Sequence, residues 1–258
     1  MGATVALTLG LSVAAASAAA QAPPEDTPTP APGEPASEPP KDELDIAAPS
    51  RKHGATTARI AAPTYARPRP GSRKRGVRVR TQTSWSGQPQ VLLVLDAATR
   101  DGEDWIKVLL PVRPNGSSGW IPRDSVVLRR TPYWVDVRLG ARRVTVYRNG
   151  KRARRFGAVI GAPGTPTPRG LAAIYERNRQ PDPGAFLGPW ALPLTAFSNV
   201  LESFGGGPGR VGLHGRAGAS LNDPLGSARS HGCIRISNRP VSWMAARLPA
   251  GTPVDVNG

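Results

Sequence analysis

The sequence predicts a mainly β protein, with a small barrel followed by a second β domain and one short C-terminal helix. Between residues 77 and 129, short apolar runs alternate with turn residues, which is the spacing of a small all-β barrel. From Tyr133 onward, apolar and polar residues alternate at period two, and Asn149-Gly150 is a strong hairpin signal. Apolar residues recur at helical spacing near the C-terminus.

The first folded domain is predicted over residues 61–130. Its expected strands are separated by polar turns and lie at residues 91–95, 105–108 and 119–121. The segments that contain Trp105 and Trp120 resemble bacterial SH3-like domains, and modules of that kind often bind cell-wall peptide or glycan. The two tryptophans could equally fill the core of the barrel.

The second domain is predicted over residues 132–258. Half-buried antiparallel strands are expected where apolar and polar residues alternate, at residues 135–139, 144–147 and 155–160. Residues 171–209 contain several Pro-rich and Gly-rich stretches, and we expect loops there that rim or cover a cleft.

The end of the chain combines a helix and a strand. Asn238 is expected to cap the N-terminus of the helix, because its side chain can accept a hydrogen bond from the first turn. Pro240 is tolerated in that first turn. Residues 252–256 alternate in the manner of a last strand.

The N-terminal segment predicts export. Residues 5–20 form an apolar run that is too short to span a bilayer and that ends in small-x-small patterns typical of cleavage sites. We therefore interpret residues 1–20 as a signal peptide or an anchor, and expect an exported protein of the cell wall or periplasmic space, secreted or tethered by its N-terminus. Residues 21–60 are predicted to be a Pro-rich and basic disordered linker.

The chain is strongly basic, with 34 Lys and Arg against 18 Asp and Glu and a formal net charge of +16. A nucleic-acid partner is not expected, because no known DNA- or RNA-binding motif is present and an exported protein rarely meets nucleic acid. An anionic cell-envelope polymer is a candidate partner. A merely solubilising surface explains the charge equally well.

The chain contains one cysteine, Cys233, within the Ser-His-Gly-Cys-Ile-Arg segment at residues 230–235. Exported proteins use cysteines mainly in structural pairs, so this unpaired thiol calls for another role. A buried cysteine acting as a small hydrophobe is the plain alternative. Its polar and cationic neighbours favour a nucleophile. An imidazole within reach, from His214 or His231, would draw the thiol proton and favour a thiolate–imidazolium pair near neutral pH.

Backbone groups complete this expected site. The carbonyl oxygen of Gly215 could orient the second ring nitrogen of the histidine before it. The backbone N–H of Cys233, with that of Gly232, could bind a developing oxyanion. A glycine at position 232 also lets another segment approach the backbone closely.

The Leu-His-Gly segment at residues 213–215, followed by Ser-His-Gly-Cys-Ile-Arg, resembles the L,D-transpeptidase (YkuD) family of peptidoglycan enzymes. The resemblance extends from about Tyr133 to Val256 and implies a β-sandwich with a small sheet that carries the motif. It implies that Cys233 is the nucleophile and His214 the general acid/base. It further implies that the Gly215 oxygen orients that imidazole, and that His231 is a second imidazole beside the substrate.

By the same resemblance, Ser230 and Arg235 line or support the donor site, although Arg235 could equally be a structural ion-pair partner. Two departures from the family pattern bear on these roles. Family members commonly carry Asp where Pro240 stands, which removes a partner for the region of Arg235. The residue after His-Gly is Arg216, where a small polar residue is common, and this suggests an altered acceptor preference.

The reaction that the resemblance implies makes the protein a cysteine acyltransferase. It cleaves the bond between the diamino acid and the terminal D-Ala of a tetrapeptide stem, leaving a thioester on the cysteine. An amine from a second stem then resolves the thioester as a 3→3 cross-link. The expected partners are therefore a tetrapeptide donor and an amine acceptor, with no cofactor and no metal, and we expect a monomer.

Three alternatives remain open from the sequence. Water as the acceptor would make the protein an L,D-carboxypeptidase that trims tetrapeptide stems. Two histidines and Cys233 could bind zinc, although a fourth ligand and the usual ligand spacing are missing. A non-catalytic cell-wall-binding protein would use the SH3-like domain and the basic segment instead.

Overall fold

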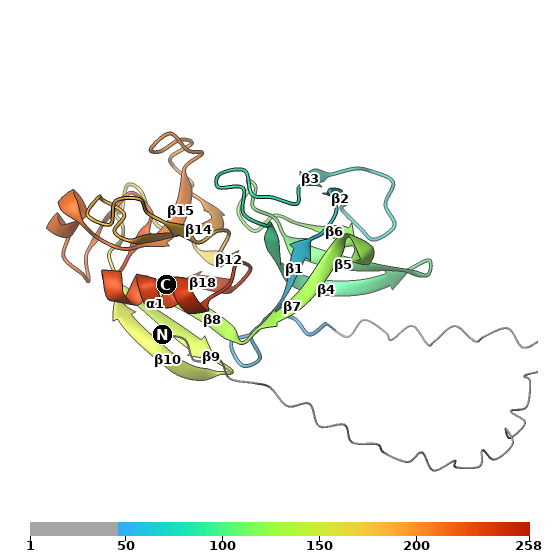
Figure 1. Ribbon diagram of the computed structural model, residues 1–258, viewed down its shortest axis with the longest axis horizontal. Helices are drawn as coiled ribbons and strands as arrows, with labels where there is room; N and C mark the ends of the chain where they lie inside the picture. The colour runs from blue at the N-terminus through green and yellow to red at the C-terminus, as the bar shows by residue number, and fades with distance from the viewer. Residues whose placement is uncertain (1–45) are drawn as a thin grey trace, which may run out of the picture. The chain divides into compact units, whose positions relative to one another are not determined.

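The computed structural model describes residues 46–258. The predicted signal or anchor segment, residues 1–20, and the first part of the predicted linker, residues 21–45, lie outside the described residues. Strands dominate the described part, and its one α-helix is α1 (Asn238–Arg247), so the mainly β prediction is confirmed (Figure 1). Within residues 46–258, no helix has the length and apolarity needed to cross a membrane.

The first lobe, residues 46–131, is built on one five-stranded antiparallel sheet. In pairing order its strands are β6 (Ser118–Pro122), β5 (Glu103–Leu109), β4 (Val91–Arg100), β1 (Ala55–Ile60) and β7 (Val126–Thr131). A ribbon of β2 (Thr64–Ala66) and β3 (Val77–Val79) and a 3-10 turn, η1 (Arg123–Ser125), complete the lobe. The edge strands β6 and β7 do not pair with each other, so the expected barrel is not closed. The resemblance to SH3-like domains stays a prediction.

The first lobe begins earlier than the sequence indicates. Strand β1 falls inside the range predicted as linker, yet it pairs with β4 on one side and with β7 on the other. Five of its six residues are buried, and four of those are small Ala or Thr side chains. Such residues give a weak apolar signal, but they fit the middle of a sheet whose large side chains come from neighbouring strands. Trp105 is 2% exposed and Trp120 is half-buried, but neither belongs to the main apolar core of this lobe, so the reading of both as core-filling residues is not supported.

The second lobe, residues 132–258, contains two main sheets. The five-stranded sheet has the order β10 (Lys151–Gly157), β9 (Arg143–Arg148), β8 (Tyr133–Arg138), β18 (Pro253–Asn257) and β12 (Gly170–Ala173). The four-stranded sheet has the order β13 (Asn178–Arg179), β14 (Trp190–Phe197), β15 (Arg210–His214) and β17 (Ile234–Arg235). A short parallel pair joins β11 (Ile160–Gly161) to β16 (Ala228–Ser230), and η2 (Gly218–Asn222) is a 3-10 turn.

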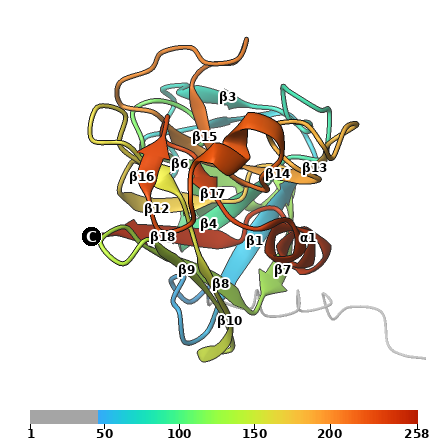
Figure 2. The same ribbon diagram turned by 90° about the vertical axis from the view of Figure 1, so that its left-hand side faces the viewer.

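A single apolar core lies between these two sheets. It contains valines of β8 and β9, leucines of β14 and β15, and the inward face of α1. Figures 1 and 2 both show β14 and β15 on one side of the β8–β18 sheet, which is the layered arrangement of a sandwich. The core explains the alternation in the sequence, because period-two apolar residues from both sheets point into it.

Local turn chemistry fixes the β9–β10 hairpin. Asn149 and Gly150 connect the two strands with φ values of 49° and 75°. Positive φ at both central residues is the geometry of a type I′ turn, which Asn-Gly favours. The hairpin predicted at this position is therefore confirmed.

The C-terminal helix forms as predicted but starts differently. Ser237 occupies the cap position, and no side chain caps the first turn. Asn238 lies inside the helix, and its Oδ1 accepts a hydrogen bond from the backbone N–H of Arg216 at 2.7 Å. The prediction of Asn238 as the cap is wrong because this longer-range bond takes the side chain away from the helix terminus.

The two lobes contact each other through specific polar bonds. The Asn115 amide donates to Phe197 O at 2.8 Å, and its Oδ1 accepts from Phe197 N–H at 2.8 Å. The Arg113 guanidinium donates to Ser198 O at 2.6 Å. Residues 81–90 of the first lobe reach the second lobe as well.

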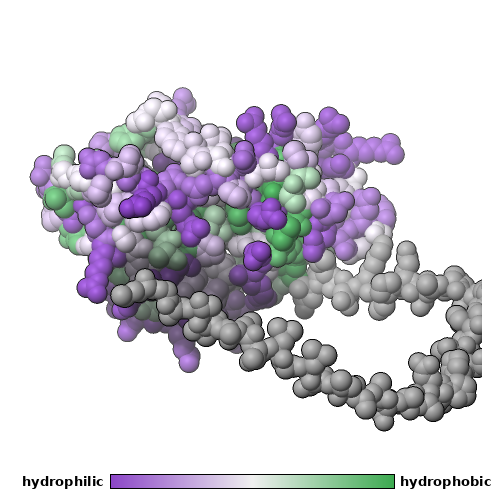
Figure 3. Space-filling model, in the orientation of Figure 1, coloured by the Kyte–Doolittle hydropathy of each residue, from purple (hydrophilic) through white to green (hydrophobic). Residues whose placement is uncertain are grey.

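The face in Figure 3 is mostly hydrophilic, in keeping with the high charge of the chain.

Candidate active site

The register of two parallel strands brings the thiol and one imidazole to the same face. Strands β15 and β17 pair with Leu213 opposite Ile234 and His214 opposite Arg235. One residue earlier, Gly212 faces Cys233. Side chains alternate along a strand, so residues 212 and 214 share a face and Cys233 lies on that face too. Cys233 and His214 accordingly line the same cavity, which has a volume of about 300 Å³.

The His214 ring is buried, with 2% of its surface exposed. Its Nδ1 lies 2.7 Å from Gly215 O, and since a carbonyl oxygen only accepts, Nδ1 carries the hydrogen and donates it. Burial lowers the pKa of His214 to about 4, against the raising effect of the Gly215 carbonyl and with a further lowering by Arg235. The imidazole is therefore neutral near pH 7, with Nε2 as its basic nitrogen.

Burial raises the pKa of the Cys233 thiol, while a backbone hydrogen bond with Gly212 and the charge of Arg235 oppose that shift. No hydrogen bond joins the thiol to the His214 ring in the described part of the chain. Burial therefore disfavours the charged form of each group. Cys233 is nevertheless half-buried and lines the cavity, so the expected thiolate–imidazolium pair stays a prediction.

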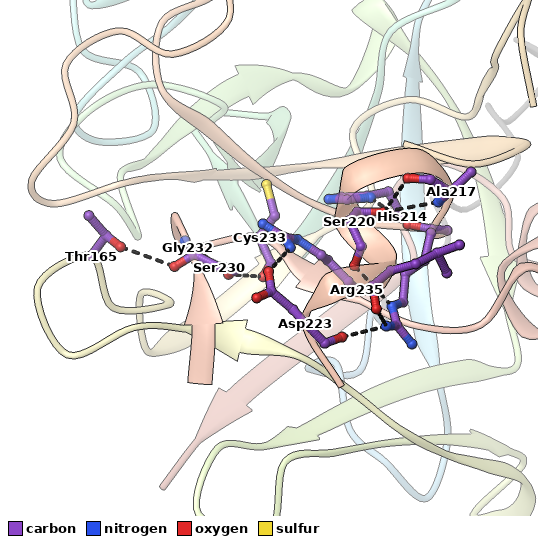
Figure 4. A network of polar contacts seen from close by, with 12 residues as sticks. Thr165, His214, Ala217, Ser220, Asp223, Ser230, Gly232, Cys233 and Arg235 are labelled. Atoms are coloured by element: carbon purple, nitrogen blue, oxygen red, sulfur yellow. Dashed lines mark hydrogen bonds and ion pairs between the residues drawn. The ribbon is translucent and has the colours of Figure 1, made fainter. Parts of the chain in front are cut away.

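Ser230 closes the turn that carries the cysteine. Its hydroxyl donates to Cys233 O at 2.5 Å and accepts from the Gly232 N–H at 3.1 Å (Figure 4). The Thr167 hydroxyl donates to Gly232 O at 2.9 Å. Gly232 has φ of 112°, a conformation that side-chain-bearing residues rarely adopt. The turn is therefore held by side-chain hydroxyls and requires glycine at its centre.

The two backbone N–H groups expected to bind an oxyanion, those of Gly232 and Cys233, differ in their hydrogen bonds. The Gly232 N–H is occupied by Ser230, so the prediction that it helps to bind an oxyanion is not supported. Within residues 46–258, no acceptor is bonded to the Cys233 N–H. The latter group remains available to a ligand.

Arg235 forms a buried ion pair. Its Nη1 lies 2.5 Å from Asp223 Oδ2, and the two side chains are 4% and 22% exposed (Figure 4). The guanidinium also lies 4.8 Å from the Phe186 ring centroid. The partner that Pro240 cannot supply thus comes from Asp223, which the sequence did not indicate.

The predicted substrate-binding residues do not reach the cavity. Ser230 is 1% exposed and engaged with the backbone, and Arg235 is 3% exposed and engaged with Asp223. Neither lines the cavity that contains Cys233. Their contacts are those of positioning residues, which hold the cysteine turn and the adjoining strand.

Gly215 and Arg216 are held beside His214 by close packing. A Cβ at Gly215 would lie 2.4 Å from Asn238 Oδ1, so no side chain fits there. Arg216 donates to Leu221 O at 3.2 Å and also to Asp223 O. It therefore fastens the loop that carries η2 and does not face the cavity, and the expected effect on acceptor preference has no support in this geometry.

His231 is exposed, and its ring stacks on Phe204 with centroids 5.2 Å apart. It lies outside the cavity lining. The structure therefore brings together Cys233 and His214 and leaves the second predicted imidazole on the rim.

In residues 46–258, no three His, Cys, Asp or Glu side chains are grouped so that they could hold a metal ion, and the zinc alternative has no ligand set there.

Most of the residues that line the cavity are not predicted by the sequence. The lining residues that carry polar or aromatic groups are Ser84, Trp85, Tyr175, Glu176, Asn178, Gln180, Phe204 and Arg210. The first two belong to the first lobe, about 150 residues before Cys233, and no local pattern links them to it. Residues 171–209, expected to be loops, do contribute to the cavity, but the segment also contains strand β14, whose Ala191 and Pro193 line it.

Comparisons with known proteins identify the family of the second lobe. The family model of the YkuD L,D-transpeptidase catalytic domain matches residues 132–256. A Bacillus subtilis (strain 168) protein, provisionally described as the L,D-transpeptidase YkuD, is 30% identical over 58% of this chain and 84% of its own length. A Bacillus licheniformis protein with the same description is 33% identical over 48% of this chain. The matching region spans 66% of the length of the latter.

Solved structures give weaker likenesses. An L,D-transpeptidase from Mycobacterium smegmatis is 18% identical, covering 66% of this chain and 91% of its own, with a TM-score of 0.40. A structure from Bdellovibrio bacteriovorus is 26% identical, covering 49% and 48% of the two chains, with a TM-score of 0.38. At these scores the assignment depends on the sequence matches alone.

Proposed function

Because this chain belongs to the YkuD family of L,D-transpeptidases, we propose that it forms 3→3 cross-links in peptidoglycan through a thioester on Cys233, with release of D-Ala. One observation carries the proposal: the only thiol of the chain and a neutral, buried imidazole line one cavity on the same face of β15 and β17. This pairing of a nucleophile with an adjacent base is what acyl transfer by cysteine needs.

In the proposed first step, the Cys233 sulfur attacks the carbonyl carbon of the diamino acid in a tetrapeptide stem. His214 Nε2 takes the thiol proton as the C–S bond forms. The C–N bond to the terminal D-Ala then breaks, and the leaving amine takes that proton from the imidazolium. The products are a thioester, free D-Ala and a neutral imidazole, so the base is ready for the next step.

In the proposed second step, an amine of another stem attacks the thioester carbonyl. The amine loses a proton to His214 Nε2 as the new amide bond forms. The C–S bond breaks, and the departing sulfur takes the proton back. Cys233 and His214 thus return to the protonation states in which the proposed cycle began.

Two features of the site support this assignment of roles. The bond from His214 Nδ1 to Gly215 O leaves Nε2 as the nitrogen that exchanges protons. The unbonded N–H of Cys233 is suited to the oxygen that becomes negative during each attack. The reaction would take place in the cell envelope, where tetrapeptide donor and amine acceptor stems are found.

The test is to incubate the full chain, and its Cys233→Ala variant, with a disaccharide-tetrapeptide and to analyse the products by mass spectrometry. Cysteine-dependent dimers that lack one D-Ala are expected. Tripeptide without dimers would show that water is the acceptor and that the protein is an L,D-carboxypeptidase. Unchanged substrate with retained binding to peptidoglycan would favour a wall-binding protein without catalysis.

A further inference from the structure

A tryptophan of the first lobe lies at the cavity of the second lobe. Trp85 lines the same cavity as His214 and Cys233, yet its side chain remains 65% exposed. An aromatic side chain so exposed contributes little to a folded core. Tryptophan is also the side chain most often responsible for binding energy at recognition surfaces.

The loop that carries Trp85 is fastened to the second lobe on both sides of it. Before it, the Ser84 N–H donates to the Tyr175 hydroxyl at 3.3 Å. After it, the Gln88 amide donates to Asn178 Oδ1 at 2.8 Å and to Arg177 O at 3.1 Å. These bonds hold the loop on both sides of Trp85 while the indole ring stays mostly exposed, which is how a rigid binding group is presented.

A glycine-rich loop of the second lobe lies against the same ring. A Cβ placed on Gly207 would lie 3.0 Å from Trp85 Cζ3, so the loop backbone packs directly on the indole. Phe204, in the same loop, is 48% exposed, lines the cavity and stacks on His231. The cavity therefore has an aromatic side chain from each lobe at its wall.

We propose that Trp85 binds the donor stem peptide, so that the first lobe completes the substrate site of the second; this inference rests on the proposed function. The peptide carries the carbonyl that Cys233 attacks, so it must occupy the cavity that both residues line. Asn178 and Gln180 line that cavity too, and apolar walls with a few amide groups are typical of sites for peptide-like ligands. A volume of about 300 Å³ suits a short segment of one stem.

The experiment compares Trp85→Ala and Trp85→Phe in the full chain. Binding of a sugar-free tetrapeptide to the Cys233→Ala protein is measured by calorimetry, with and without each change. Trp85→Ala is expected to weaken binding about fivefold or more, and Trp85→Phe to retain most of the affinity. In the protein with Cys233 intact, alkylation of the thiol by iodoacetamide should change less than about twofold, since Trp85 contacts the ligand and not the thiol.

Val77→Ala is the matched control, because Val77 is an exposed apolar residue of the same lobe and lies outside the cavity lining. An equal loss in this control, or unchanged tetrapeptide affinity in Trp85→Ala, would overturn the assignment. So would a loss seen only with a disaccharide-tetrapeptide, since Trp85 would then contact the sugar. Failure of the Cys233→Ala protein to bind any tetrapeptide would contradict the proposed function itself.

Discussion

The Ser230 hydroxyl lies 2.5 Å from Cys233 O and donates a hydrogen bond to it. The Ser230 hydroxyl oxygen also accepts from the Gly232 N–H, so one side chain closes the turn from both ends. Cys233 is outside β17, and its backbone position therefore depends on Ser230 as well as on the strand that follows. The serine of the Ser-His-Gly-Cys motif thus acts on the nucleophile through the backbone.

We expect Ser230→Ala to lower the free energy of unfolding by about 1–3 kcal/mol, because it leaves a buried N–H and a carbonyl without their partner. Acyl-enzyme formation should slow as well, since the turn under Cys233 loosens. Chemical denaturation and single-turnover acylation measure the two effects. Ser227→Ala is the control: its buried hydroxyl has no hydrogen-bond partner among residues 46–258, and its removal should cost less than about 0.5 kcal/mol. Equal losses in the two variants would contradict the role of Ser230.

Asp223→Asn should destabilise the protein because it leaves the buried charge of Arg235 without a counter-ion. Loss of one partner of a fully buried pair costs about 3–5 kcal/mol, and the partial exposure of Asp223 reduces our expectation to about 2 kcal/mol. Denaturant unfolding measures it. The matched control is Asp101→Asn, which removes an exposed ion pair with Arg100 and should cost less than about 1 kcal/mol. A cost no greater than that of the control would show that Asp223 does not support the site.

The sequence predicts the elements that local patterns encode. Alternation gives the strands on both sides of the Asn149-Gly150 hairpin, because a half-buried sheet needs one apolar face. The Ser-His-Gly-Cys motif likewise identifies Cys233, because its polar neighbours are contained in a few consecutive residues. The residues alone leave the choice between His214 and His231 open, and it is the resemblance to the family that favours His214.

Long-range contacts have no such signal. Asp223 becomes the partner of Arg235 only through the loop between β15 and β17, and Trp85 reaches the cavity from another lobe. Burial also acts against one electrostatic expectation, because it raises the pKa of the Cys233 thiol and lowers the pKa of His214. The small residues of β1 are predicted as linker for a similar reason. The strands that pair with β1, which are β4 and β7, lie far along the chain.

The buried imidazole should make stability depend on pH. The pKa of His214 is about 4 in the folded protein and near its ordinary value of 6.5 when unfolded, so the unfolded chain binds the proton more tightly. The contribution of neutral His214 to the free energy of unfolding is complete above pH 6.5 and is lost as the pH falls towards 4. About 2 kcal/mol of this contribution is lost between pH 7 and 5.

Unfolding free energies at pH 7 and 5 test this dependence. His214→Gln should remove most of the difference between the two pH values. His53→Gln should retain it, because His53 is exposed and belongs to the first lobe. The same pH dependence in wild type and His214→Gln would show that other groups cause it.

Gly215→Ala should disturb the orientation of the His214 imidazole without altering the Cys233 thiol. The added Cβ would clash with Asn238 Oδ1 and lie 3.0 Å from Pro189 Cδ, so either these side chains or the backbone that orients His214 must shift. We expect a loss of about 1–3 kcal/mol in the free energy of unfolding, together with slower acylation of Cys233 by the tetrapeptide. Iodoacetamide alkylation should change less than acylation, because it depends on the thiol and not on an oriented base. The matched control is Gly164→Ala, where a Cβ would meet nothing within 4 Å, and it should leave both quantities near the wild-type values. If acylation and alkylation slowed equally in Gly215→Ala, the carbonyl of Gly215 would have no specific part in orienting His214.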